Sequence, residues 1–123
     1  MHELETVFKM LADETRLRLL MALREDKYCV CELVALFNLS QPKVSKHLAM
    51  LKAHGFVTSQ RVEKYVYYTV DADAVLVRDV LRVIHTRRPL YPQLMEDAAR
   101  IKQIQSLEDR PRIVCDGLGE DAR

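Results

Sequence analysis

Residues 38–48 read NLSQPKVSKHL, and this stretch decides the fold. Asn38 tolerates the left-handed backbone conformation that often ends a helix, and Ser40 is a favoured residue for capping the start of the next one. Pro42 falls in the first turn of that helix, where its missing N–H does no harm. A helix, a short turn and a second capped helix are typical of a helix-turn-helix.

The surrounding sequence continues this helical pattern. Asp13 is placed to cap one helix, and Gly55 is placed to end another in the left-handed conformation. The predicted helices around the turn share apolar residues at helical spacing, and they cover residues 3–11, 14–25, 30–37 and 41–53.

The character of the chain changes after Gly55. Residues 56–61 and 65–70 are rich in β-branched and aromatic side chains, which predicts a hairpin whose tip is residues 62–64. Asp71 or Asp73 is expected to cap a fifth helix, and a further helix is predicted over residues 90–104. The sequence thus indicates a mainly α fold with a small β-hairpin (α+β), a winged helix-turn-helix. Residues 1–105 would form the folded domain, and residues 106–123 a flexible tail.

The composition fits one soluble globular domain. The chain has 123 residues, of which 49% are apolar and 30% charged, with only 3 Gly and 4 Pro. No apolar run approaches the roughly 18 residues of a membrane span, and the N-terminus does not resemble a signal peptide. We therefore expect a cytoplasmic protein with no membrane partner, whose three cysteines are thiols or metal ligands.

Positive charge is concentrated in the middle of the chain. Residues 40–65 contain five Lys and Arg residues against the single acid Glu63, whereas the whole chain has a net charge of only +1. A basic region of this kind suits a polyanion such as DNA, although a solvated lysine-rich helix face has the same composition. The second helix of a helix-turn-helix enters the major groove, and a wing reaches the backbone or minor groove. The candidate DNA-binding residues are therefore Ser40, Gln41, Lys43, Ser45, Lys46 and His47, with Arg61, Lys64 and Tyr65 at the wing.

Several stretches resemble one family. The segments LADETRLRLL (11–20), LSQPKVSKHL (39–48), LKAHGFV (51–57) and VYY (66–68) are similar to those of ArsR/SmtB-family bacterial repressors. The resemblance implies that residues 1–105 are a DNA-binding and dimerisation domain. It implies a homodimer, built from the first and fifth helices, that binds double-stranded operator DNA until an effector releases it. The family usually has Gly at the wing tip, where this chain has Glu63.

The cysteines resemble those of the arsenite-sensing type within that family. Cys29-Val30-Cys31 precedes Glu32, where those relatives have Cys-Val-Cys-Asp, and their third cysteine would fall on Val34. Soft thiolates select thiophilic ions, so we expect trivalent arsenic or antimony as the effector, with no cofactor needed for folding. Cys115 is the candidate third ligand, supplied from the tail or from a partner chain. A helix N-terminus with Lys27 nearby is expected to lower the thiol pKa.

The spacing of the two cysteines suggests a switch. Residues i and i+2 of an ideal helix lie about 200° apart, on opposite faces. Two thiolates that share one ion must lie only about 3.7 Å apart if the ion is tetrahedral with bonds of about 2.3 Å. We therefore expect effector binding to unwind the start of the helix over residues 30–37.

The sequence also leaves other functions open. The same cysteines could sense oxidants or a divalent soft metal such as cadmium. A thiol-exchange enzyme is a further alternative, but the chain lacks a βαβ pattern or a Gly-rich phosphate loop. The last alternative is a winged-helix module that binds protein rather than DNA.

Overall fold

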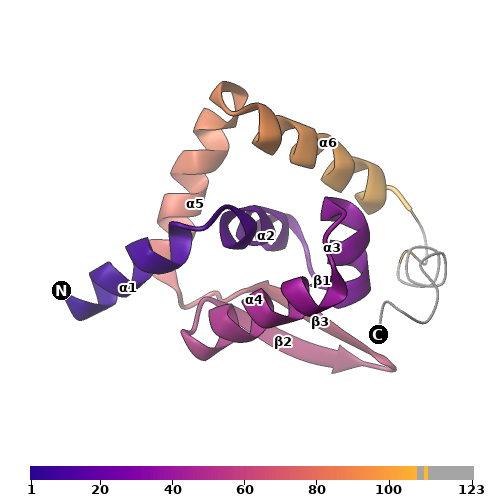
Figure 1. Cartoon of the computed structure of the whole chain (residues 1–123), viewed down its shortest axis with the longest axis horizontal. Coiled ribbons are helices and arrows are strands. Elements are labelled where there is room, and N and C mark those ends of the chain that lie inside the picture. The colour runs from indigo at the N-terminus through magenta and orange to yellow at the C-terminus, as the bar shows by residue number, and fades with distance from the viewer. Residues whose placement is uncertain (108–109, 111–123) are drawn as a thin grey trace.

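The structure is a computed structural model, and it describes residues 1–107 and 110. It is mainly helical with a small three-stranded antiparallel sheet, as the winged helix-turn-helix prediction requires (Figure 1). In chain order the elements are α1 (His2–Leu11), α2 (Glu14–Glu25), β1 (Tyr28–Cys29), α3 (Val30–Phe37), α4 (Gln41–Ala53), β2 (Val57–Val62), β3 (Tyr65–Val70), α5 (Val75–Arg87), the 3-10 turn η1 (Arg88–Leu90) and α6 (Pro92–Gln105). Most of the predicted tail, residues 106–123, lies outside the described residues.

The ends of the helices follow from local capping. The Asp13 carboxylate accepts a hydrogen bond of 3.0 Å from the Arg16 N–H at the start of α2. The Ser40 hydroxyl accepts one of 3.3 Å from the Lys43 N–H at the start of α4. Asn38 ends α3 in the left-handed region (φ 53°, ψ 46°), and Gly55 follows α4 with φ 77°. These four predictions are confirmed, and Asn38 and Ser40 set the turn between α3 and α4.

The prediction for the cap of α5 is wrong. The residue before this helix is Ala74, and no side chain caps it. Asp71 instead accepts a hydrogen bond of 2.8 Å from the Asp73 N–H. An Asp side chain that bonds the backbone two residues on closes a turn, so Asp71 shapes the connection from β3 to α5.

The sheet contains one strand that the sequence did not predict. The strand order is β1-β3-β2, with both pairs antiparallel. β1 is only two residues long, with Tyr28 opposite Tyr68 and Cys29 opposite Tyr67. The hairpin of β2 and β3 forms the wing, and β1 joins that wing to the start of α3.

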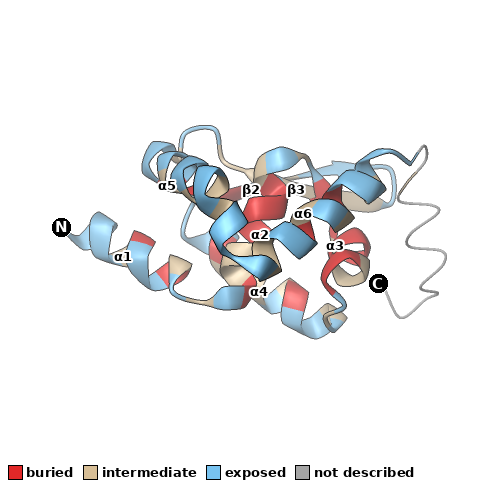
Figure 2. Cartoon of the chain, turned by 90° about the horizontal axis from the view of Figure 1, so that it is seen from above, coloured by how far each residue is buried: buried red, intermediate tan, exposed pale blue. Residues whose placement is uncertain are grey.

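Helix α2 lies at the centre of the molecule. Figure 1 shows it framed by α5, α6 and α3, with α4 and the sheet below, and Figure 2 colours the ribbon by how far each residue is buried. Each neighbouring element contributes apolar side chains that are fully or almost fully buried around α2: Leu33, Leu36, Val44, Leu48, Leu51, Val57, Val77, Leu81 and Ile101. The helix-turn-helix therefore rests on a core shared with α5 and α6.

Polar contacts fasten α6 to the rest of the fold. The Arg18 guanidinium on α2 donates to both carboxylate oxygens of Asp97 on α6, at 2.8 and 3.0 Å, and lies 5.0 Å from the centre of the Phe37 ring. Arg100 on α6 donates to the Leu36 carbonyl at 3.2 Å, near the end of α3. The Asp97 side chain is almost fully buried, so α6 is an integral part of the domain.

Candidate thiol site and nucleic-acid interface

The two cysteines meet at the junction of β1 and α3. Cys29 is the residue before α3 and has an extended backbone (φ −88°, ψ 168°), whereas Cys31 lies in the first helical turn. Their sulfur atoms are 3.3 Å apart, and both side chains are buried. The Cys29 N–H donates to the Glu32 carboxylate at 2.9 Å, which fixes the backbone that holds the first sulfur.

This geometry removes the reason for the predicted unwinding. The prediction treated both cysteines as helical, which would put their side chains on opposite faces. Cys29 instead precedes the helix, and its extended backbone turns its side chain toward Cys31. Two sulfur atoms can therefore share an ion while α3 stays wound. The expectation of unwinding is wrong because Cys29 is not a helical residue.

The expected lowering of the thiol pKa is also wrong for Cys29. Burial, reinforced by the nearby Glu32 carboxylate, raises the pKa of Cys29 to about 12. The Lys27 ammonium lies over the Tyr67 ring, 5.2 Å from the ring centre. A buried thiol next to a carboxylate keeps its proton.

Three residues that the sequence did not single out complete the surroundings of the cysteine pair. Tyr67 of β3 packs against the two cysteines together with Tyr65. Glu32 is fully buried, and its second carboxylate oxygen accepts a hydrogen bond of 2.7 Å from Arg110. Glu32 could have been found from its position three residues after the helix cap, whereas Arg110 lies 78 residues away and has no local signal. The predicted third ligand, Cys115, lies outside the described residues.

Helix α4 presents its first turns to solvent. Ser40, Lys43 and Lys46 are exposed, and Gln41 is half-buried and donates to the Ser45 hydroxyl at 3.2 Å. These predicted residues come together on one end of α4 with their polar groups accessible, next to the positive end of the helix dipole.

His47 differs from these neighbours. Its ring is half-buried, and its Nδ1 atom is buried with no hydrogen-bond partner among the described residues. Burial lowers the pKa of His47, against the opposing effect of the Asp13 carboxylate. The ring therefore belongs to the packing between α4 and the start of α2 as much as to the exposed face.

The remaining DNA-binding candidates lie on the wing, and they differ in exposure. Arg61 and Lys64 are exposed near its tip, between β2 and β3. Glu63 occupies the tip with φ 57°, a conformation that favours glycine. Tyr65 packs against the cysteine pair and its hydroxyl is buried, so the structure places it at the thiol site.

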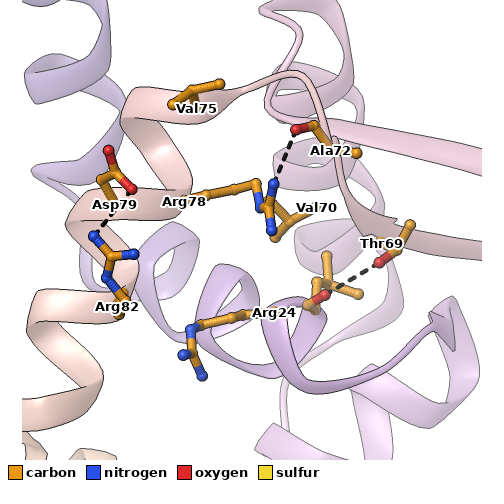
Figure 3. A pocket seen from close by; sticks show the side chains of 9 residues that line it. Arg24, Thr69, Val70, Ala72, Val75, Arg78, Asp79 and Arg82 are labelled. Carbon is orange, nitrogen blue, oxygen red and sulfur yellow. Dashed lines mark hydrogen bonds and ion pairs between the residues drawn. The ribbon is translucent and has the colours of Figure 1, made fainter.

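A hollow lies between α2, β3 and α5. It has a volume of about 490 Å³ and is lined by Arg24, Arg78, Arg82 and Asp79, among others (Figure 3). Arg78 donates to the Ala72 carbonyl at 3.1 Å, and Arg82 pairs with Asp79 at 3.2 Å. Because these two guanidinium groups already have partners within the chain, we assign no ligand to this hollow.

The described part of the chain lacks two further features. Across residues 1–107 and 110, no group of three or more His, Cys, Asp or Glu side chains is arranged to hold a metal ion. Over the same residues, every helix is too short or too polar to cross a membrane.

The fold and the exposed basic helix define a winged helix-turn-helix DNA-binding regulator. Residues 13–59 match the profile described as "Bacterial regulatory protein, arsR family". Arsenic resistance transcriptional regulator ArsR2 of Pseudomonas putida is 35% identical over 111 residues, which cover 89% of this chain and 95% of that protein. The chain belongs to the ArsR family.

Further relatives agree with this assignment. The arsenical resistance operon repressor of Escherichia coli is 44% identical over 63 residues, which are 50% of this chain and 54% of that protein. Among solved structures, the transcriptional regulator HlyU of Vibrio vulnificus is 35% identical with a TM-score of 0.62, covering 71% of this chain and 86% of its own. Reduced HlyU of Vibrio cholerae is 29% identical with a TM-score of 0.65, covering 73% and 90%. The relatives matched are transcription regulators and not enzymes.

Proposed function

We propose that this protein is a homodimeric repressor that leaves its operator when trivalent arsenic or antimony binds Cys29, Cys31 and Cys115. The observation that carries the proposal is the 3.3 Å separation of the Cys29 and Cys31 sulfur atoms. The names of the relatives from Pseudomonas putida and Escherichia coli, both concerned with arsenic resistance, support the same effector.

The separation of the sulfur atoms favours a pyramidal ion. With bonds of about 2.3 Å, two sulfurs 3.3 Å apart subtend an angle of roughly 90° at a shared ion. A pyramidal three-coordinate ion with a lone pair has angles near this value, whereas tetrahedral zinc needs a wider angle and about 3.7 Å between sulfurs. The pair thus suits As(III) better than tetrahedral zinc.

The protonated state of Cys29 is compatible with this chemistry. Arsenite at neutral pH is arsenous acid, which carries three hydroxyl groups on arsenic. Each thiol forms one sulfur–arsenic bond as one arsenic–oxygen bond breaks, and the thiol proton leaves with that hydroxyl as water. Three thiols therefore bind one arsenous acid and release three waters, with no change in oxidation state. A raised pKa at Cys29 slows this exchange without preventing it.

We assign DNA recognition to the start of α4 and to the wing. Gln41 suits the edge of adenine, and Lys43 and Lys46 suit guanine or phosphate. The other candidates are Ser40 and Ser45 beside them on α4, and Arg61 and Lys64, which reach the backbone or minor groove from the wing. His47 and Tyr65 are weaker candidates, because each is partly occupied by packing within the chain.

Apolar surface on α1 and α5 supports the homodimer. Phe8 on α1 is 59% exposed, and Val75 and Val83 on α5 are 62% and 58% exposed. Figure 2 shows α1 extending from one end of the molecule with most of its surface exposed. A second copy would cover these side chains, and its two-fold axis would place two α4 helices on successive half-sites.

The experiment is fluorescence anisotropy of the reduced protein on DNA from upstream of its own gene, titrated with arsenite, beside the variant Cys29→Ser/Cys31→Ser. We expect arsenite to release the parent and to leave the variant bound. Two further arms use cadmium and the thiol oxidant diamide. Release by diamide alone would replace the metalloid with an oxidant as the signal, and DNA binding that ignores all three would overturn sensing at the cysteine pair.

A further inference from the structure

One tyrosine of the wing packs against the cysteine pair and carries a buried hydroxyl. Tyr65, the first residue of β3, contacts the cluster formed by Cys29 and Cys31. The residue as a whole is half-buried, but its hydroxyl oxygen is buried and has no hydrogen-bond partner among the described residues. A buried hydroxyl without a partner is unfavourable, so it favours a ligand that brings a hydrogen-bonding atom to the site.

The strand pairing places Tyr65 and Cys29 on the same face of the sheet. Cys29 lies opposite Tyr67, and residues opposite each other in an antiparallel pair carry their side chains on one face. Side chains alternate along a strand, so Tyr65 shares that face with Tyr67 and is a diagonal neighbour of Cys29. Tyr28 belongs to the opposite face by the same alternation, and its ring is part of the main apolar core.

Two contacts hold the Tyr65 ring in place. The Lys64 ammonium lies over the ring, 5.3 Å from its centre. The centre of the Tyr67 ring is 6.3 Å away, with the two ring planes inclined at 56°. Contacts of both kinds stabilise the orientation of an aromatic ring. The hydroxyl is therefore positioned before a ligand binds, which reduces the entropy lost on binding.

The two described thiols leave one oxygen on arsenic. Cys29 and Cys31 form two sulfur–arsenic bonds with arsenous acid as two arsenic–oxygen bonds break, and each thiol proton leaves with its hydroxyl as water. The product is a two-thiol adduct in which As(III) keeps its third hydroxyl, with no change in oxidation state. The oxygen of that hydroxyl accepts hydrogen bonds, whereas sulfur is a weak acceptor and a methyl group is none.

Resting on the proposed function, we infer that Tyr65 is a specificity-determining residue of the thiol site. Its hydroxyl donates a hydrogen bond to the oxygen that arsenic keeps in the two-thiol adduct, which is the stage before any third sulfur–arsenic bond. Tyr65 keeps its own proton throughout. The site therefore favours inorganic arsenite over a methylated trivalent arsenical, in which a methyl group replaces that hydroxyl.

The test compares Tyr65→Phe with its parent in a Cys115→Ser background. This background removes the one cysteine outside the described residues, so Cys29 and Cys31 are the only thiols of the chain. Arsenite affinity is measured by equilibrium competition with a dithiol chelator. Tyr65→Phe removes only the hydroxyl, and we expect it to weaken arsenite binding about fivefold, the effect of one lost hydrogen bond.

Stability without arsenite separates a ligand contact from a structural one. Because the Tyr65 hydroxyl has no partner among the described residues, its removal should not lower the melting temperature. A clear fall would overturn the inference, since it would give the hydroxyl a partner within the protein.

A methylated arsenical tests whether the contact is made to oxygen. Methylarsonous acid carries one methyl and two hydroxyl groups on arsenic, and the two thiols displace both hydroxyl groups as water. The bound arsenic then has no oxygen, and its methyl group is close in size to the hydroxyl it replaces. We expect Tyr65→Phe to bind methylarsonous acid at least as tightly as its parent does. Equal losses for both arsenicals would overturn the inference, because Tyr65 would then act on the cysteines alone.

Tyr28→Phe is the matched control. Tyr28 is the residue before Cys29, and its hydroxyl is also buried without a partner among the described residues. It lies on the other face of the sheet, so the same deletion should leave arsenite affinity unchanged. A fivefold loss in Tyr28→Phe would overturn the specific role of Tyr65.

Two other results would overturn the inference. The first is a Tyr65→Phe variant that binds arsenite as tightly as its Cys115→Ser parent. The second is a Cys115→Ser protein that does not bind arsenite, because the two-thiol adduct would then not form. Failure of the proposed function is separate, since the protein with all three cysteines would then stay on its operator in the presence of arsenite.

Discussion

Cys29 lies directly opposite Tyr67 in the antiparallel pairing of β1 with β3. Tyr67 is at the same time opposite Gln60 in the pairing of β3 with β2. One residue of the wing is thus paired on one side with the strand that carries a candidate ligand and on the other with the outer strand of the wing. The thiol site and the wing are parts of a single sheet.

We therefore expect effector binding to change the conformation of the wing more than that of α4. Arsenite added to the reduced protein should shift the backbone NMR resonances of residues 28–31 and 65–68 more than those of residues 41–53. The physical reason is that β3 is in register with Cys29, whereas α4 follows the site in the chain only after α3. The Cys29→Ser/Cys31→Ser variant is the control and should show no shifts. Shifts confined to residues 30–53 would contradict this route.

Glu63 is expected to be a poor residue for the wing tip on two counts. Its φ of 57° costs an L-residue roughly 1 kcal/mol relative to glycine, so Glu63→Gly should raise the melting temperature by about 4 °C. Its charge also faces the phosphates that the wing would approach. Glu63→Gln removes that charge and keeps the side chain, and we expect it to tighten operator binding roughly twofold without raising stability. Equal melting temperatures for all three proteins would contradict the strain argument.

Lys43 and Lys46 are expected to contribute through phosphate or base contacts. Each change to Ala should weaken operator binding, and loss of a phosphate contact should reduce the slope of log K against log salt by about 0.9. Anisotropy at several salt concentrations gives the slope. Lys102→Ala, on α6 and away from α4, is the control. A slope that stays the same in both variants would show that neither Lys43 nor Lys46 contacts a phosphate.

His47 should make the protein sensitive to mild acid. Burial lowers its pKa below the ordinary 6.5, against the Asp13 carboxylate and with the help of Arg16, Lys43 and Lys46. The unfolded chain then binds the proton more readily, so the stability that comes from a neutral ring is complete above about pH 6.5 and is lost as the pH falls through the folded-state pKa. Melting temperatures between pH 5 and 8 should show this fall in the parent and a flatter profile in His47→Gln. An unchanged profile would show that the ring does not contribute.

Asp97 is expected to be the most sensitive position for stability. It is 3% exposed and neutralises Arg18, which is itself 13% exposed. Asp97→Asn leaves a buried guanidinium without its counter-ion, and breaking a buried pair in this way costs about 3–5 kcal/mol. Urea unfolding measures the loss. The double change Arg18→Met/Asp97→Leu removes both charges and should recover much of it, and a loss below about 1 kcal/mol in Asp97→Asn would contradict the assignment.

Local signals allowed much of this fold to be predicted. Asn38 and Ser40 each act on the backbone within a few residues, so the sequence alone placed the turn between α3 and α4, and Gly55 in the same way placed the end of α4. The wing hairpin followed in the same way from alternating β-branched and aromatic residues. The two cysteines could be singled out by their spacing and by the resemblance to the family.

Long-range pairing could not be predicted. A strand of two residues leaves no alternation, so β1 and the extended backbone of Cys29 were not predicted, and with them the spacing of the sulfur atoms. Burial of Cys29 likewise depends on Tyr65 and Tyr67, which are distant in sequence. The contact of Arg110 with Glu32 joins residues 78 positions apart, for which no local pattern exists.

The segment that carries the family match is not a unit that can be moved on its own. Residues 13–59 include α2, α3 and α4, but the side chains that close over α2 include Leu81 and Ile101, from α5 and α6. A chimera that grafted only this segment onto another protein would contain α4 but would lack the apolar side chains of α5 and α6 that complete its core. A transplant of the specificity of this regulator must therefore carry α5 and α6 as well, since their side chains complete the core around α2.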